Sequence, residues 1–177
     1  MTRLNVLTLT TLASLSLAVA FPAGDAAAQQ KQQVSFKTPA ANTKYTQQTT
    51  VDVGDVPGHQ VRVFELHRTY PSDAPVINGL KLTEMWTRGV TDFIDGTGSS
   101  VNYSVYMLEN GDKVFSRTAL VAQSLGSGKF TTTSAGTITG GTGKLAGIQG
   151  IIRTTGTAEP KAGVNENQTD IEYWFDK

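Results

Sequence analysis

The stretch VNYSVYMLENGDKVFSRTALV, residues 101–121, decides the fold class of this chain. Two runs rich in Val, Tyr, Phe and Leu, at 101–109 and 113–121, flank the tripeptide Asn110-Gly111-Asp112. β-Branched and aromatic residues favour strands, and Asn-Gly readily takes the positive φ angles of a tight hairpin turn. The stretch therefore predicts two antiparallel strands joined at 110–112.

Similar runs, separated by clusters of Gly, Pro, Asn and Asp, recur on both sides of this hairpin. They predict further strands near 60–68, 81–94, 129–139, 148–158 and 168–175, with an eighth at 50–53. No window shows the 3.6-residue apolar repeat of a helix that would cover one face of the sheet. An open sheet would expose its edges, so we expect an all-β fold closed into a single antiparallel eight-stranded barrel, with a β-sandwich as the alternative.

The N-terminus has the three parts of a secretory signal peptide. Arg3 gives a basic start, residues 6–21 are apolar, and small residues end in Ala26-Ala27-Ala28. The apolar run of about 16 residues is shorter than the roughly 20 that a spanning helix needs, which argues against the alternative of a retained membrane anchor. We expect cleavage after Ala28 and a secreted or periplasmic mature protein that does not span a membrane.

The mature chain starts with a segment of low apolar content, residues 29–48, which is rich in Gln, Thr, Lys and Ala. Such a composition predicts an extended N-terminal arm or a loosely held first strand, which Val34 and Phe36 could dock. The predicted organisation is therefore a signal peptide at 1–28, an extended arm at 29–48 and a β-barrel domain at 49–177.

Charge and composition exclude several classes of function. The chain has 15 Lys and Arg, 15 Asp and Glu, and no Cys. A net charge of zero without a basic cluster gives no electrostatic basis for binding nucleic acid or an anionic membrane surface. Without Cys there are no disulfides, thiolate nucleophiles or Cys-based metal sites. The two histidines, His59 and His67, do not form a recognisable ligand set, so we expect neither a metal nor a cofactor.

A Gly-rich segment, ITGGTGKLAGIQG at 138–150, separates the strands expected at 129–139 and 148–158. A sharp reversal and close packing at a barrel rim both suit residues without a Cβ. A phosphate cradle is the alternative, but it needs Gly-Lys followed by Ser or Thr and then a helix, whereas Leu145 follows Lys144. We expect a structural turn made by Gly140, Gly141, Gly143, Gly147 and Gly150.

This Gly-rich segment resembles the strand-turn-strand segment of the allene oxide cyclase and dirigent barrel superfamily, in which Gly-Gly-Thr-Gly precedes an aromatic or apolar step and a further Gly. Leu145 stands where the family more often has an aromatic residue. The hairpin at 110–117 is similar to the Gly-Asp-Lys-Val-Phe segment of secreted bacterial proteins with this barrel.

The resemblance implies a calycin-like barrel of the allene oxide cyclase type. It also implies self-association, because members are often homo-oligomers. Plant members steer the cyclisation or coupling of a reactive apolar intermediate without a cofactor. Their functional acids, asparagine and cysteine do not map onto this chain, which has no Cys, so their activity does not carry over.

Strand alternation puts polar side chains on the same face as apolar ones, and such a face can line a cavity. On the strand at 60–68, Glu65 and His67 share one face, and on the strand at 81–94 a second face is assigned Leu82 together with Glu84, Trp86 and Arg88. The candidate cavity residues are Glu65, His67, Glu84, Trp86, Arg88, Tyr103 and Arg117.

Each candidate has an alternative role. The Glu, Trp and Arg of 81–94 are either pocket residues or an exposed ladder with a cross-strand ion pair. His67 beside Glu65 is either a general base or a surface pair. Arg117 and Arg153 either point inward, where a buried cation needs a carboxylate or an anionic ligand, or lie at the rim with a wet guanidinium.

Three functions remain open from the sequence. The first is a non-enzymatic secreted or periplasmic binding protein whose barrel receives a small apolar or aromatic molecule. The second is a cofactor-independent isomerase or cyclase, which requires Glu65, Glu84, His67 or Arg117 to converge inside the cavity. The third is a structural or interaction protein with a filled barrel.

Overall fold

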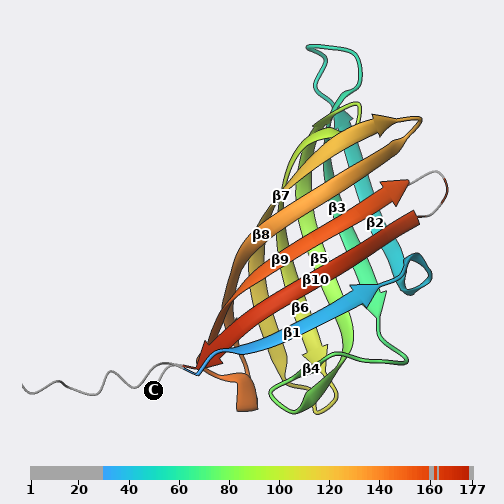
Figure 1. The fold of residues 1–177 in the computed structure, drawn as a ribbon. Coiled ribbons are helices and arrows are strands. Elements are labelled where there is room, and N and C mark those ends of the chain that lie inside the picture. The colour runs from blue at the N-terminus through green and yellow to red at the C-terminus, as the bar shows by residue number, and fades with distance from the viewer. Residues whose placement is uncertain (1–29, 160–161, 163, 176–177) are drawn as a thin grey trace, which may run out of the picture.

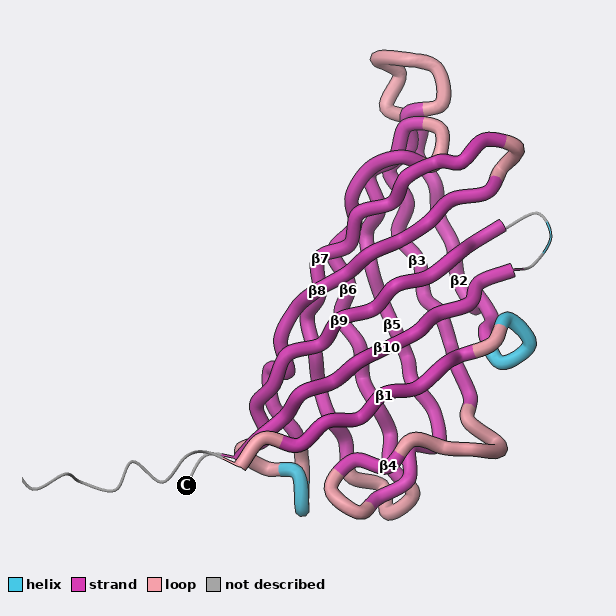
Figure 2. The backbone as a smooth tube through the Cα atoms, viewed as in Figure 1, coloured by secondary structure: helices cyan, strands magenta, loops and turns pink. Residues whose placement is uncertain are grey.

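The computed structural model describes residues 30–159, 162 and 164–175, and over these residues the protein is an all-β fold (Figures 1 and 2). The all-β part of the predicted fold class is thereby confirmed. Every pairing of neighbouring strands is antiparallel. The predicted signal peptide, residues 1–28, lies outside the described residues.

Ten strands and two short 3-10 turns make up the described fold. The strands are β1 (Gln32–Thr38), β2 (Thr43–Asp52), β3 (His59–Thr69), β4 (Val76–Ile77), β5 (Leu80–Ile94), β6 (Thr97–Leu108), β7 (Lys113–Gly126), β8 (Lys129–Gly141), β9 (Ile148–Glu159) and β10 (Val164–Phe175). The turns are η1 (Ala40–Asn42) and η2 (Gly143–Leu145). The seven main predicted strands all exist, the predicted eighth is the end of the longer β2, and the sequence did not predict β4.

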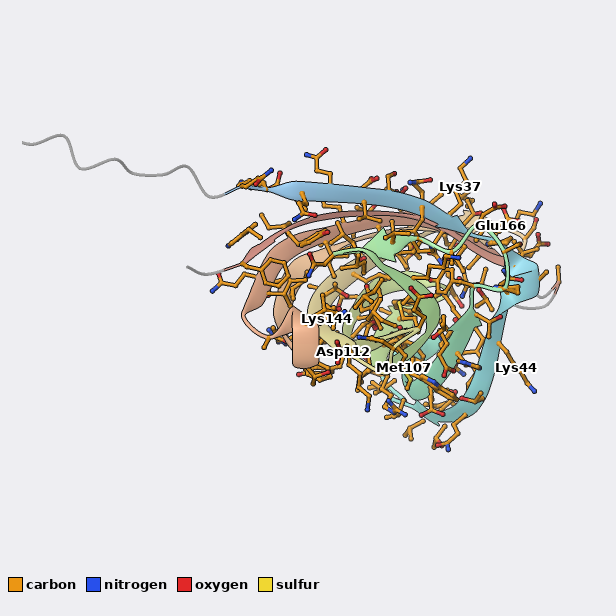
Figure 3. The ribbon with its side chains drawn as sticks, turned by 90° about the horizontal axis from the view of Figure 1, so that it is seen from below. Lys37, Lys44, Met107, Asp112, Lys144 and Glu166 are labelled. Carbon is orange, nitrogen blue, oxygen red and sulfur yellow. The ribbon has the colours of Figure 1, made fainter. Side chains whose placement is uncertain are left out.

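The strands form one sheet in the order β1-β10-β9-β8-β7-β6-β5-β3-β2, with the short β4 attached to β5. Figure 3, seen from below, shows that this sheet curls around an interior, and that Lys37 of β1 and Lys44 of β2 point away from it. The edge strands β1 and β2 are not hydrogen-bonded to each other within the described residues, so the closed eight-stranded barrel is not confirmed.

The two edges of the sheet are nevertheless neighbours along the chain, because only residues 39–42 separate β1 from β2. β1 pairs with β10 and β2 pairs with β3, so the corner at Pro39 joins the two ends of the curled sheet covalently. Side chains also bridge this seam. Asn165 of β10 donates through Nδ2 to the Tyr45 hydroxyl of β2 at 3.2 Å.

Residues 29–48, predicted as an extended arm, supply β1 and half of β2. Phe36 is buried in the core and packs edge-on against Tyr70 with ring centroids 5.7 Å apart. Val34 is partly buried against the same cluster. The predicted boundary at residue 49 falls inside β2, so the arm and the following domain form one sheet.

The hairpin at 110–112 joins β6 and β7 as the sequence predicts. Of the first two turn residues only Gly111 has a positive φ, 86°. Asn110 shapes the turn with its side chain, since its Oδ1 accepts the Asp112 amide at 3.0 Å and its Nδ2 donates to the Asp112 carboxylate at 2.7 Å. The turn is an Asx-type turn with one left-handed residue rather than a turn with two.

The Gly-rich segment lies at the end of β8, in η2 and at the start of β9. Gly143 has a φ of 55°, and a Cβ there would collide with the Asp112 carboxylate, which accepts the Lys144 amide at 2.9 Å. Leu145 is fully buried beside this turn. Strand β9 follows directly, without the helix that a phosphate cradle requires.

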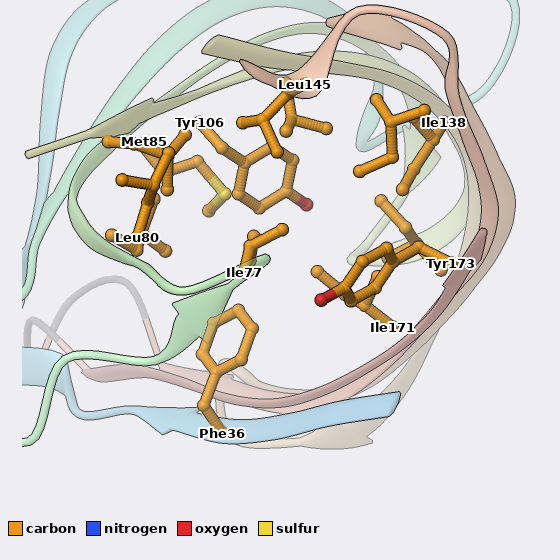
Figure 4. Close-up of a cluster of buried hydrophobic side chains, with 14 of the residues drawn as sticks. Phe36, Ile77, Leu80, Met85, Tyr106, Ile138, Leu145, Ile171 and Tyr173 are labelled. Atoms are coloured by element: carbon orange, nitrogen blue, oxygen red, sulfur yellow. The ribbon is translucent and has the colours of Figure 1, made fainter. Parts of the chain in front are cut away.

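The hydrophobic core fills one end of the curled interior (Figure 4). Inward side chains at the start of β5, β7 and β9 and at the end of β6, β8 and β10 meet there because antiparallel neighbours present opposite ends. Ile77 of β4 lies among them and Leu145 closes the cluster. The core residues are Phe36, Tyr70, Ile77, Leu80, Leu82, Met85, Tyr106, Leu108, Val114, Ile138, Leu145, Ile148, Ile152, Ile171 and Tyr173.

Candidate functional site

The other end of the interior, which we call the hollow half, contains a cavity of about 110 Å³. Its wall comes from the inward faces of β1, β2, β3 and β5 to β10, and most of its side chains are Ser, Thr, Asn or aromatic. Several hydroxyls and amides pair among themselves. Thr87 Oγ1 lies 2.9 Å from Ser104 Oγ, and Ser100 Oγ donates to Asn102 Oδ1 at 2.7 Å. The cavity is therefore an ordered polar site rather than a packing defect.

Arg68 lies where the hollow half meets the core. Alternation along β3 turns it inward with Leu66, and in register it faces Met85 of β5. Its exposed fraction is 9%. One Nη donates to Asn165 Oδ1 across the seam at 3.3 Å, and its buried Nε has no hydrogen-bond partner. A cation that is nine-tenths buried thus lines the cavity with a free donor.

No carboxylate balances Arg68 among the described residues, since none of their Asp or Glu oxygens lies within 4.0 Å of it. Burial lowers the pKa of its guanidinium, but arginine starts high enough to remain protonated in proteins. Burial raises the pKa of Tyr70, and it raises that of Tyr106 to about 12. These two neighbours are therefore neutral near pH 7 and supply no counter-charge.

A second arginine, Arg62, lines the same cavity six residues before Arg68 on β3. Its guanidinium lies 5.6 Å from the centre of the Tyr45 ring and 5.5 Å from that of Phe64, within cation–π range. One Nη donates to Gln48 Oε1 at 3.0 Å, while its buried Nε has no partner. The described lining holds two arginines and no Asp, Glu, Lys or His, so the cavity has an excess of positive charge.

The seven predicted cavity residues do not line this cavity. All seven belong to the outer face of the sheet. The structure therefore corrects their predicted placement: Glu65, His67, Glu84, Trp86, Arg88, Tyr103 and Arg117 point away from the interior.

Five of these residues contact one another on the outside. His67 Nε2 lies 2.6 Å from Glu84 Oε2, and the same carboxylate accepts the Trp86 indole N–H at 3.2 Å. The His67 and Trp86 rings stack with centroids 4.0 Å apart. Arg88 pairs with Glu65 at 2.6 Å. These residues therefore form a ladder with cross-strand ion pairs on the outer face, which was the alternative to a pocket.

Tyr103 and Arg117 form the next part of the same outer face. The Arg117 guanidinium lies 5.9 Å from the centre of the Tyr103 ring, and the Tyr103 side chain is 57% exposed. Arg153 is likewise exposed, in register with Ala135 and Asp170. The interior arginines are Arg62 and Arg68 instead of Arg117 and Arg153.

A β-bulge explains the error on β5. The pairing of β5 with β6 shifts register between Leu82 and Glu84, so Leu82 points inward while Glu84, two residues later, points outward. After the bulge, Met85 and Thr87 continue the inward face. Because side chains alternate with a period of two, one extra residue exchanges the two faces.

The error on β3 has a different cause. Its inward face carries Arg62, Phe64, Leu66 and Arg68, and its outer face carries Glu65 and His67, so both faces mix charged and apolar residues. The pair Phe64 and Leu66 was the available signal for the inward face, because these two side chains expose more apolar surface than Val61 and Val63 of the outer face do.

The described residues contain neither a cluster of metal-ligating side chains nor a membrane-spanning helix. No group of three or more His, Cys, Asp or Glu side chains in the described part of the chain is placed to hold a metal ion. No helix among those residues is long and apolar enough to cross a membrane. Comparisons of the chain with known protein families, with curated proteins and with solved structures give no match.

Proposed function

We propose that this protein binds a small organic molecule in the hollow half of its interior. One observation carries the proposal: on β1 and on β5 to β10, the inward face forms the packed core at one end and lines a cavity with polar and aromatic side chains at the other. A sheet selected only for stability would continue its apolar face, since burial of apolar surface is the main favourable term in folding.

The lining changes the expected ligand. The sequence led us to expect an apolar or aromatic guest, but the apolar half of the interior is filled by its own side chains. The cavity offers the rings of Phe64, Phe93 and Phe130 together with hydroxyl and amide groups. A ligand with a flat apolar body and at least one polar group fits this wall best.

The size of the cavity limits the ligand. Pockets for drug-sized molecules enclose about 300–1,000 Å³, and an apolar cavity of about 150 Å³ accommodates benzene. The cavity, at about 110 Å³, is smaller than this but only partly enclosed, so it suits a molecule of a single ring with a short substituent, part of which extends into the opening.

Binding fits the cavity better than the isomerase or cyclase alternative. General acid–base catalysis works best with groups whose pKa lies near the operating pH. The titratable side chains that line the cavity within the described residues are arginines and tyrosines, and the pKa of Tyr106 is about 12. Glu65, Glu84, His67 and Arg117, which the enzymatic hypothesis requires inside, lie outside.

The filled-barrel alternative is favoured only by the small volume of the cavity. We also propose that the sheet closes into a barrel and that the protein is related to the allene oxide cyclase and dirigent superfamily. We further propose that it is secreted and self-associates. These proposals follow from the sequence motifs and the predicted signal peptide.

Native mass spectrometry of the protein purified from its own host tests the proposed function. We expect a mass excess that disappears on denaturation. Thr132 and Thr133 are adjacent on β8, and only Thr132 lines the cavity. Thr132→Phe should abolish the mass excess and the matched control Thr133→Phe should retain it. A bare wild-type mass in every preparation would overturn the proposal in favour of the structural alternative.

A further inference from the structure

The charge of the cavity wall identifies the class of ligand more closely than its size does. An ion removed from water loses several kcal/mol of solvation unless a partner of opposite charge or several hydrogen bonds replace the water. Arg68 has one hydrogen bond to the neutral Asn165 side chain, at 3.3 Å, and an unsatisfied Nε. In the described structure this guanidinium lacks the partner that its burial calls for.

The surroundings of Arg68 are built to keep this charge rather than to neutralise it. Asn165 Oδ1 also accepts Asn167 Nδ2 at 2.9 Å, and Asn165 Nδ2 donates to Tyr45 at 3.2 Å, so the amide is fixed at both ends. The second cation, Arg62, has a buried Nε without a partner as well. Two cations of one wall repel each other unless an anion lies between or beside them.

We propose that the cavity binds the carboxylate of a small organic acid, with the carboxylate at Arg68 and the organic body against Phe64 and Tyr45. This inference rests on the proposed function and names its ligand class. A guanidinium edge matches a carboxylate with two parallel N–H···O bonds, and such charge-assisted bonds are about twice as strong as neutral ones.

The position of Arg68 favours an organic acid over an inorganic anion. Arg68 lies at the floor of the hollow half, next to the core residue Met85 in register. Beside it, Tyr45 and Phe64 pack edge to face with ring centroids 5.8 Å apart, and the Tyr45 hydroxyl and Arg68 share Asn165 as a hydrogen-bond partner. An inorganic anion at Arg68 would leave this aromatic part of the wall without a contact, whereas the ring of an aromatic acid would cover it.

Titration calorimetry of the full mature protein with sodium benzoate and with neutral benzamide tests the proposal directly. We expect benzoate to bind more tightly than benzamide. In Arg68→Met, benzoate affinity should fall by about 10- to 100-fold, the loss expected for one charge-assisted contact. Benzamide affinity should change little. The matched control is Arg153→Met, which removes the same charge from the outer face and should bind benzoate like the wild type.

The other outcomes separate this inference from the proposed function. If benzamide binds as well as benzoate, or if a host-derived ligand found by native mass spectrometry is neutral, the anionic class is wrong while binding in the cavity stands. If phosphate or chloride binds at Arg68 and no benzoate does, the organic acid is wrong. The comparison of benzoate with benzamide on the wild type needs no variant, so it decides the matter even if Arg68→Met does not fold.

Discussion

The two ends of the interior are built on the same strands and differ in almost every respect. β9 contributes Ile148 and Ile152 at the filled end and Thr154 at the hollow end. β10 contributes Tyr173 at the filled end and Asn165 at the hollow end. The backbone pairing is continuous through both ends. The difference therefore lies in the inward side chains alone, which shows that half of this sheet suffices for the core.

The two ends should therefore contribute differently to the stability of the fold. The filled end buries large apolar side chains and closes with β4 and Leu145, so it should supply most of the stability. The hollow end holds hydrogen-bonded hydroxyls and an unbalanced cation, which contribute little or act against folding. The four predictions below test that division.

The largest effect is expected at the filled end. Leu82 is fully buried in the core. Leu82→Ala should lower the free energy of unfolding by about 2–5 kcal/mol, because it removes buried methyl groups and leaves a cavity. Chemical denaturation measures this change. The matched control is Val121→Ala on the outer face, where Val121 is 62% exposed, and it should change stability by less than about 0.5 kcal/mol. A similarly small effect of Leu82→Ala would contradict the division.

The same comparison explains how far sequence could predict this fold. At the filled end, Val, Ile, Leu and Tyr alternate with polar residues, so strands such as β6, β9 and β10 follow from their own residues. The Asn-Gly hairpin was equally clear. β1 and β4 were harder, because β1 has only Val34 and Phe36 as inward apolar residues, and the two-residue β4 depends on its contact with β5.

The site was much less predictable than the fold. At the hollow end the inward face is polar, so hydrophobicity no longer distinguishes it from the outer face, and the Glu, His and Trp cluster was placed inside instead of outside. The bulge at 82–84 added a change of face that no local pattern indicates. Arg68 lies on the face opposite to Glu65 and His67, and its burial depends on Asn165, 97 residues later in the chain.

The second prediction concerns the buried cation. If Arg68 serves the ligand at the expense of stability, Arg68→Met should raise the free energy of unfolding of the ligand-free protein by about 1–3 kcal/mol, as replacements of buried charges by apolar residues often do. Chemical denaturation checks the sign. Arg153→Met should leave stability nearly unchanged. A clear destabilisation by Arg68→Met would show instead that its hydrogen bond to Asn165 holds β3 and β10 together across the seam.

The third prediction concerns the neutral polar pairs of the hollow half. Thr87 and Ser104 are buried, and their hydroxyls lie 2.9 Å apart. Thr87→Val or Ser104→Ala alone should cost about 1–2 kcal/mol, because each leaves the other hydroxyl without its partner. The double variant should cost less than the sum of the two. Additive losses in the double-mutant cycle would mean that cavity water already satisfies both hydroxyls.

The smallest effect is expected at the outermost part of the hollow end, where β3 begins. His59 Nδ1 lies 2.6 Å from the Asp55 carboxylate and its Nε2 lies 2.8 Å from that of Asp92. Hydrogen bonds to Asp92 and Asp55 raise the pKa of His59 above its ordinary value of 6.5. The backbone amide of Val56 and the His59 side chain lower the pKa of Asp55 below 3.8.

These two shifts fix the sign of the pH dependence. A raised histidine pKa stabilises the fold below the unfolded value and the effect is lost as pH rises through the folded value. A lowered Asp pKa stabilises above its unfolded value and is lost in acid. The melting-temperature difference between wild type and His59→Gln should therefore be greatest near about pH 5–6 and shrink towards about pH 8.5. Salt should reduce it, because the pair is near the surface. A difference that grows with pH would show that neutral His59, rather than the imidazolium between two carboxylates, holds the start of β3.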